Sequence, residues 1–351
     1  MAAALTSRAR VADNPGVRSI GGRRIGGAAA IAAVAVAVGI GAFGASAHRL
    51  AASPPARLGG CNVFPAFPGG ANAPSAADQT AWNQDISNAP LDPNSGSYMS
   101  AIRGLGGNQA IHPDFGGNGA YGIPYVVVGA HQRRYQVHFN AYGDESDKGP
   151  YPIPPNAPVE GGSDHHVLAL QKGKCRLYEM YGAHFDGRSH RWIAGSGAVF
   201  NLKRPGPLRH DGWTSADAAG LPILPGLVRS GEVKHGVVHH AIRVTFDETR
   251  EGYFHPATHF ASSSCDRFLP PMGLRLRLKS GYDISRFSGQ AHVIAVALQN
   301  YGVINADNGS NWYITGASSK GWNDGNLNQL KSIPGSAFEV VENAASQKSP
   351  C

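Results

Sequence analysis

Residues 161–185 read GGSDHHVLALQKGKCRLYEMYGAHF, and this stretch contains two apolar runs separated by a short polar loop. The runs cover residues 167–170 and 175–181, and the loop at 171–174 contains a glycine. Two apolar runs joined in this way are typical of a β-hairpin. The stretch therefore predicts a hairpin near the middle of the chain.

Acidic and imidazole side chains accompany this hairpin. Asp164 and His166 precede the first apolar run, and Glu179 lies within the second. Alternate residues of a strand share one face, so an extended segment would turn Asp164 and His166 to the same side. These groups can accept and donate protons, and we expect them to line a functional cleft.

The composition favours a globular protein with many turns. Of the 351 residues, 42% are hydrophobic and only 16% are charged, while Gly 46 and Pro 24 are high. Leucines and basic residues alternate over 274–280, which predicts a strand with one solvent-facing side, and residues 290–301 have helical periodicity. We expect one mainly β domain with a few helices, an antiparallel, jelly-roll-like β-sandwich over 81–345, and a tail at 346–351.

The N-terminal region has the pattern of an export signal. In residues 1–47 a basic leader ends in an arginine pair, an Ala/Gly-rich apolar run follows, and Ala45-Ser46-Ala47 fits a cleavage site. The leader is similar to a twin-arginine signal. The alternative is an uncleaved membrane anchor at 25–47, and residues 48–80 are interpreted as a linker or wrapping segment. We expect an exported protein, either extracellular or in the cell envelope.

The four cysteines all follow this region. An even number of cysteines in an exported protein favours disulfides, and four cysteines allow three pairings. Cys61 and Cys351 lie near the two ends of the mature chain. We therefore favour a bond between them, with Cys175–Cys265 as the inner pair.

The formal charge of +7 does not indicate a nucleic-acid partner. Five of the arginines lie in residues 1–47, and the remaining basic residues form no run. Binding to a phosphate backbone requires a clustered basic face, so nucleic acid is excluded from the expected partners. Contact with a membrane is expected only through an uncleaved N-terminal segment.

Several phrases are similar to those of a family of exported bacterial proteins. They are GSDHH at 162–166, RLYE at 176–179, GWTSADAAGLPI at 212–223, LPPMG at 269–273 and ADNGSNWYI at 306–314. The resemblance would cover most of the chain after the N-terminal region. It implies no particular activity and assigns no catalytic residue.

The leading functional hypothesis is action on a polysaccharide or envelope glycan. Five tryptophans and twelve tyrosines offer aromatic faces for sugar rings, and we name Trp213, Trp312 and Tyr253 as substrate-binding candidates. Glycoside hydrolysis needs two carboxylates beside the scissile bond. Asp164 and Glu179 are the expected pair, with Asp217 and Asp307 held in reserve.

A lyase would need a different set of groups. Elimination from a uronide requires a base, for which His166 or Tyr178 is the candidate, and a cation such as Arg243 to stabilise the developing enolate. Two alternatives of another class remain open. One is a non-catalytic protein that binds glycan or another protein in the cell envelope.

The other alternative is a metal-binding protein. Imidazole and carboxylate groups are good metal ligands, and zinc or calcium is the expected ion. The candidate ligands are His166, His240, His255 and His259. The last two have the i, i+4 spacing of a ligand pair on a helix, although Pro256 opposes a helix there.

Overall fold

The computed structural model describes residues 57–64, 81–106, 109–116, 121–203, 209–343 and 347–351. The expectation of a mainly β protein with few helices is confirmed, since strands assemble into four sheets in this part of the chain. The finer expectation of a single jelly-roll-like sandwich is not confirmed. No helix among these residues has both the length and the apolar character needed to cross a membrane.

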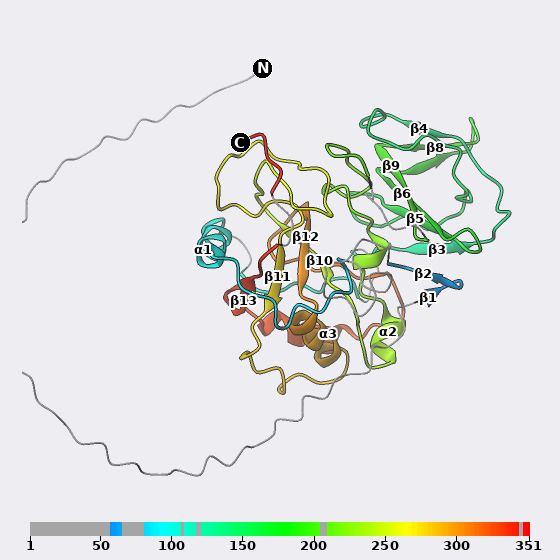
Figure 1. Ribbon diagram of the computed structural model, residues 1–351. Coiled ribbons are helices and arrows are strands. Elements are labelled where there is room, and N and C mark those ends of the chain that lie inside the picture. The colour runs from blue at the N-terminus through cyan, green and yellow to red at the C-terminus, as the bar shows by residue number, and fades with distance from the viewer. Residues whose placement is uncertain (1–56, 65–80, 107–108, 117–120, 204–208, 344–346) are drawn as a thin grey trace, which may run out of the picture. The chain divides into compact units, whose positions relative to one another are not determined.

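One four-stranded sheet has the order β10-β12-β11-β13, and we call it the β10 sheet. Its strands are β10 (Ile242–Phe246), β11 (Arg275–Leu278), β12 (Val303–Asn308) and β13 (Phe338–Val340). β10 and β12 are parallel, whereas β11 is antiparallel to both of its neighbours. The periodic segment at 290–301 forms helix α3 (Gly289–Asn300), which packs against this sheet (Figure 1).

A second four-stranded sheet, the β5 sheet, has the order β3-β5-β6-β9. It contains β3 (Tyr125–Val128), β5 (Val167–Gln171), β6 (Arg176–Tyr181) and β9 (Ser196–Asn201). β5 and β6 are antiparallel and form the predicted central hairpin, which is confirmed. A three-stranded sheet, the β8 sheet, joins β4 (Val137–Phe139), β8 (Arg191–Ala194) and β7 (His184–Asp186).

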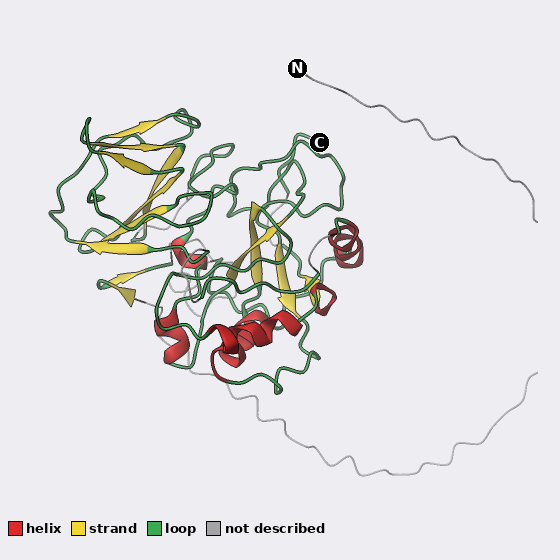
Figure 2. Cartoon of the chain, turned by 180° about the vertical axis from the view of Figure 1, so that it is seen from behind, coloured by secondary structure: helices red, strands yellow, loops and turns green. Residues whose placement is uncertain are grey.

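The remaining elements are short. Two strands, β1 (Arg57–Leu58) and β2 (Cys61–Asn62), pair with each other. The other α-helices are α1 (Ser95–Gly104), α2 (Ser230–Lys234) and α4 (Asp324–Leu327), and Figure 2 shows the helices in red. Three 3-10 helices are η1 (Leu224–Gly226), η2 (Asn328–Ser332) and η3 (Gly335–Ala337).

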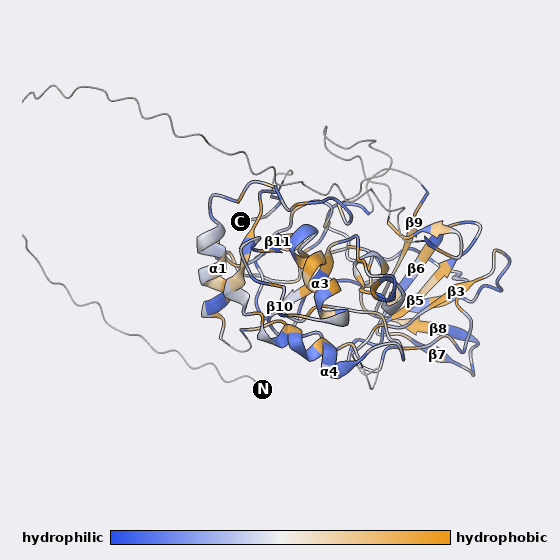
Figure 3. Cartoon of the chain, turned by 90° about the horizontal axis from the view of Figure 1, so that it is seen from below, coloured by the Kyte–Doolittle hydropathy of each residue, from blue (hydrophilic) through white to orange (hydrophobic). Residues whose placement is uncertain are grey.

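The buried hydrophobic side chains of the described residues form three core clusters, which lie between the sheets and helices. Along β5, Val167 belongs to a core shared with the β8 sheet, whereas Leu168 belongs to the next core, which also contains Ile304 of the β10 sheet. We call this second cluster the middle core. The third core lies between the β10 sheet and α3, whose hydrophobic residues appear orange in Figure 3. Both faces of the central hairpin are therefore buried, which explains why its strands are apolar throughout.

The strand at 274–280 forms, but the expectation that one of its sides faces solvent is wrong. All four residues of β11 are buried, including both arginines. Arg277 donates to Glu339 and to the backbone carbonyls of Ile86, Ser87 and Ala89. The loop that contains these carbonyls covers the outer face of β11 and satisfies the buried guanidinium.

The expected disulfide pairing is also wrong, although all four cysteines are bonded. Cys61 pairs with Cys175, and Cys265 pairs with Cys351. The first bond attaches the β1–β2 hairpin to the start of β6 across a Cα–Cα distance of 5.3 Å. Near the second bond, Tyr253 and Lys348 exchange backbone hydrogen bonds, which bring the C-terminal end to the loop at 251–265 instead of to Cys61.

Candidate functional site

The candidate site is built on two adjacent parallel strands. Arg243 lies on β10, and Asp307 lies near the end of β12, opposite Thr245. Ile242 and Val244 pack on the side of the sheet that faces α3. Because side chains alternate along a strand, Arg243 points the other way, towards the middle core.

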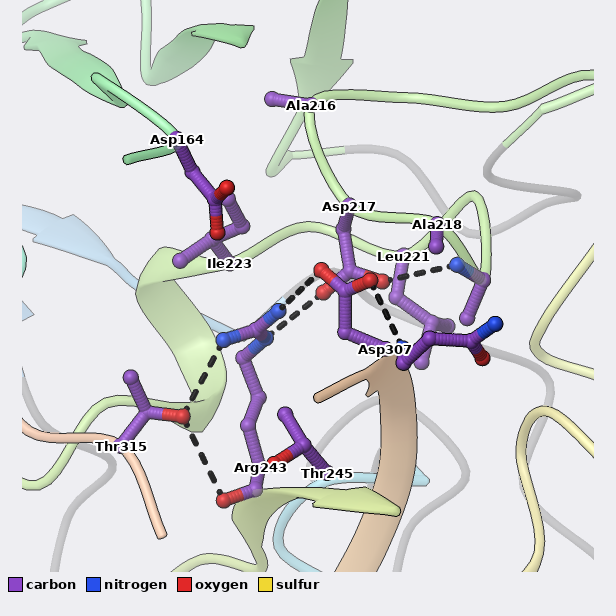
Figure 4. Close-up of polar contacts among 12 residues, drawn as sticks. Asp164, Ala216, Asp217, Ala218, Leu221, Ile223, Arg243, Thr245, Asp307 and Thr315 are labelled. Atoms are coloured by element: carbon purple, nitrogen blue, oxygen red, sulfur yellow. Dashed lines mark hydrogen bonds and ion pairs between the residues drawn. The ribbon is translucent and has the colours of Figure 1, made fainter. Parts of the chain in front are cut away.

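Arg243 links two carboxylates and a hydroxyl (Figure 4). Its Nε donates to Oδ2 of Asp217 across 2.6 Å, its Nη1 donates to Thr315 at 3.1 Å, and its Nη2 lies 3.5 Å from Oδ2 of Asp307. We call Asp217, Arg243 and Asp307 the Arg243 cluster. A Cβ at Gly226 would lie 2.6 Å from Cγ of Arg243, so the buried stem of the arginine requires glycine there.

The loop at 213–221 holds Asp217 in place. The backbone N–H of Asp217 donates to Oγ of Ser215, and its Oδ1 accepts a hydrogen bond from the N–H of Ala219. The Asp217 side chain is fully buried. An ionised carboxylate in such a position is tolerated because it is paired with Arg243 and hydrogen-bonded to the backbone.

A second ion pair joins the β5–β6 hairpin to the same loop. His166 is buried, and its Nδ1 lies 2.5 Å from Oε2 of Glu160 while its Nε2 donates to the carbonyl of Ala216 at 2.9 Å. Both partners are acceptors, so both ring nitrogens carry protons. Burial alone would lower the pKa of His166, but the hydrogen bond and charge of Glu160 outweigh burial and raise it. Correspondingly, the pKa of Glu160 is lowered, despite burial, by His166.

Asp307 differs from the other members of the Arg243 cluster because it reaches the surface. About 23% of its side chain is exposed. Burial and the nearby charge of Asp217 raise the pKa of Asp307 to about 7, against the opposing effect of Arg243 and His166. Burial also raises the pKa of Asp217. Since Asp217 has the shorter bond to Arg243, the arginine stabilises the ionised form of Asp217 more than that of Asp307.

Glu179, one of the two carboxylates first expected to act on substrate, lies inside the protein. It is 0% exposed and accepts hydrogen bonds from the backbone N–H groups of Ile223 and Leu224 at the start of η1. Burial raises the pKa of Glu179 to about 7, and the two backbone donors only partly offset this effect. The position gives Glu179 a role in joining β6 to η1.

Asp164 and Tyr181 lie near Asp307 at the surface, and Tyr142 lies near Tyr181. Asp164 is in the turn before β5 and is half-buried, and Figure 4 shows its carboxylate turned towards the Arg243 cluster. Its charge contributes to the raised pKa of Asp307. Tyr181, at the end of β6, is 36% exposed, and its pKa is raised by burial and by the charge of Asp164. Tyr142, another electrostatic neighbour of Tyr181, is 46% exposed.

Local backbone geometry explains the position of Tyr181. A Cβ at Gly195 would lie 2.9 Å from the Tyr181 ring, and the N–H of Tyr142 donates to the carbonyl of Gly195. The glycine therefore allows the ring to lie directly against the backbone between β8 and β9. Through the same segment Tyr142 is held near this ring.

The aromatic candidates from the sequence lie in other surroundings. Trp312 is 1% exposed and packs against Phe246 and Phe338, and Tyr253 is buried as well. Tyr178 is 1% exposed, and its hydroxyl accepts from Arg134. Only Trp213 among the named substrate-binding residues is partly exposed.

The four histidines proposed as metal ligands do not converge. His240 is buried beside Glu232, His255 lies beside Asp211, and Nδ1 of His259 bonds to the carbonyl of Ala218. The residues at 255–259 form no helix, so the i, i+4 spacing does not place two rings on one face. In the described part of the chain, the one group of three close potential ligands is Glu251, Cys265 and Cys351, and its two sulfurs form a disulfide.

A large cavity of 1060 Å³ lies away from the Arg243 cluster. Its wall includes Tyr125, His239 and Glu232. Although burial favours the neutral form, Arg229 and His240 lower the pKa of Glu232 to about 2. The Glu232 carboxylate already forms ion pairs and stays ionised near neutral pH. We therefore consider the Arg243 cluster the better candidate for acid–base chemistry.

The sequence contained a signal for part of this cluster. Arg243 interrupts a mostly apolar strand, and a charged residue in such a strand indicates a buried ion pair or a functional group. Asp217 and Asp307 were reserve candidates. Glu160, Tyr142 and Tyr181 were not named, because only the folded chain brings them to the site.

The chain matches no protein-family model, no curated protein and no solved structure.

Proposed function

We propose that this protein hydrolyses glycosidic bonds of a polysaccharide at Asp307 and Asp164. The observation that carries the proposal is that Asp307 is partly exposed and has a pKa of about 7. A carboxyl group that keeps its proton near neutral pH is suited to protonate the leaving oxygen of a glycoside. Asp307 accepts a hydrogen bond from the N–H of Asn308 at 2.9 Å, and its other carboxylate oxygen lies 3.5 Å from Nη2 of Arg243.

Asp164 provides the second carboxylate that the reaction needs. It is half-buried, belongs to a different segment, and is an electrostatic neighbour of Asp307. In glycosidases the second carboxylate either activates a water molecule or attacks the sugar directly. The anomeric form of the first product distinguishes these two routes.

Tyr142 and Tyr181 support a carbohydrate substrate. Tyr181 is exposed beside the two carboxylates, and the exposed Tyr142 is a neighbour of Tyr181. Exposed aromatic rings bury the apolar faces of ligands at little cost in conformational entropy. The lyase alternative has less support, because both nitrogens of His166 are bonded and Tyr178 is buried.

The test is release of reducing ends by the purified full chain from a panel of polysaccharides. We expect Asp307→Asn to reduce turnover by about 10²-fold or more, which is the usual contribution of a general acid, while the fold is retained. Asp164→Asn should reduce turnover as well. The matched control is Asp283→Asn, which changes an exposed aspartate in the turn before α3.

Turnover at the wild-type rate in both Asp307→Asn and Asp164→Asn would overturn the assignment. Saturable glycan binding without any product would instead favour the non-catalytic glycan-binding protein. Unsaturated products would indicate a lyase.

A further inference from the structure

A second surface feature lies at the other end of the β5–β6 hairpin. Two adjoining cavities of 360 and 550 Å³ share Arg134, Arg176, Tyr178 and Asn201 in their walls. Lys148 lines the first cavity, and Lys174 and Lys203 line the second. We call the two cavities together the basic groove.

The five basic residues of the groove come from four separate segments. Arg134 precedes β4, Lys148 lies in the loop after β4, Lys174 and Arg176 flank the start of β6, and Lys203 follows β9. This explains why no basic run appears in the sequence. The folded chain creates a cluster of positive charge that the linear order of residues hides.

These cations are not neutralised by acidic residues. None of the five forms an ion pair with a residue in the described ranges. One acid, Asp147, lines the first cavity, but it is paired with Arg209 and accepts from the N–H of Val199. All five side chains are exposed. The field of such a concave basic surface attracts anions.

One cation of the groove is held in a defined position. Nη2 of Arg134 donates to the Tyr178 hydroxyl at 2.9 Å, and its guanidinium lies over the Tyr178 ring. Gln171 in turn donates to the carbonyl of Ala130, which leads into the loop that contains Arg134. A guanidinium held in this way suits a planar carboxylate or a sulfate group, because it presents a fork of donors.

We infer that the basic groove binds the carboxylate or sulfate groups of an acidic polysaccharide. The groove has the volume of a small-ligand site, and the half-buried Asn201 in its wall offers a hydrogen-bonding amide to sugar hydroxyls. The two aromatic side chains that line the groove, Tyr151 and Tyr178, are 0% and 1% exposed and offer no free ring for stacking bases. The polar lining also lacks the large apolar side chains that insert into a membrane.

The inference is independent of the chemistry at Asp307, and it is tested by binding. Calorimetric titration of full-length Asp307→Asn, which removes the candidate acid, is performed with oligogalacturonate, its carboxyl-reduced neutral counterpart, and a sulfated galactan oligosaccharide. We expect saturable binding of at least one acidic probe, with affinity at least about tenfold above that of the neutral one. The carboxylate and sulfate probes identify which anion is preferred.

The double substitution Lys148→Gln/Arg176→Gln should weaken that binding by about tenfold and reduce its dependence on salt. The matched control, Arg188→Gln/Lys320→Gln, removes one arginine and one lysine that are exposed outside the groove and should bind normally. Three outcomes would overturn the inference. They are equal binding of acidic and neutral probes, no binding of either acidic probe, and unchanged affinity in the groove variant. Tighter binding of a DNA oligonucleotide or of anionic lipid vesicles, lost in the same variant, would replace it with another partner.

If acidic probes bind but wild-type protein yields no product from any polysaccharide, the groove assignment stands and the proposed hydrolase fails. If products form but the groove variant binds and turns over normally, the hydrolase stands and the groove assignment fails.

Discussion

Arg243 donates from Nε to Oδ2 of Asp217 across 2.6 Å, although the two residues lie on different segments, a strand and a loop. The arginine is 3% exposed and the aspartate side chain is fully buried. Neither charge is hydrated, so each depends on the other for compensation. The pair therefore attaches the loop at 213–221 to the β10 sheet and determines where Asp307 meets the surface.

Removing one member of this pair should be severely destabilising. Arg243→Met leaves Asp217 buried without its partner, and we expect the free energy of unfolding to fall by about 3–5 kcal/mol. The double variant Arg243→Met/Asp217→Asn should recover part of this loss, because it no longer buries an unpaired charge. Urea unfolding of the three proteins measures the effect, and equal stability of wild type and Arg243→Met would contradict it.

Turnover should depend on the proton of Asp307. Because its pKa is raised to about 7, the carboxyl is protonated below that pH and loses its proton above it. With Asp307 as the general acid, turnover should fall about tenfold for each pH unit above roughly 7. Initial rates from pH 5 to 9 on a substrate found in the panel provide the measurement. A rate that instead rises with pH around pH 7 would mean that Asp307 acts as a base.

Glu179 should make the protein less stable as pH rises. Its pKa is raised to about 7 in the folded state, so between about 4.5 and 7 the folded protein holds a proton that the unfolded chain releases. The stability contributed by the neutral group is complete at low pH and is lost as pH rises through this window. The change amounts to about 3 kcal/mol.

Glu179→Gln cannot titrate, so the difference in unfolding free energy between wild type and this variant should shift by that amount between pH 4 and pH 8. Asp307 titrates in both proteins and largely cancels in the difference. Glu248→Gln, at an exposed position, is the control and should give a flat difference. A flat difference for Glu179→Gln as well would show that its carboxyl is ionised throughout.

Glu232 should have the opposite pH dependence. Arg229 and His240 overcome burial and lower its pKa to about 2, so its ion pairs stabilise the fold above about 4.5. This contribution is lost as pH falls from about 4.5 towards 2. Glu232→Gln should lower the free energy of unfolding by about 3 kcal/mol at pH 7 and by much less near pH 2.

Thermal or urea unfolding at the two pH values checks the Glu232 prediction. The exposed Glu342→Gln is its control. If Glu232→Gln lowers the free energy of unfolding equally at pH 7 and pH 2, the loss would come from altered packing and not from the removed charge.

Several local elements can be predicted from the sequence alone. The apolar runs at 167–170 and 175–181 specify β5 and β6, because a short polar loop with glycine can only return the chain alongside itself. Helical periodicity likewise specified α3. The presence of disulfides followed from the even number of cysteines, since that conclusion needs no knowledge of which ones meet.

Contacts between residues that are distant in sequence depend on the folded chain. The sequence predicted Glu179 as a catalytic carboxylate in a cleft, but β6 lies in the centre of a sheet covered on both faces, and the residue is buried. Burial and the charge of Asp217, which is remote in sequence, raise the pKa of Asp307, and the basic groove gathers cations from four segments. Local patterns record hydrophobicity and turn geometry, whereas burial, pKa and charge clustering depend on contacts between segments that the linear order does not contain.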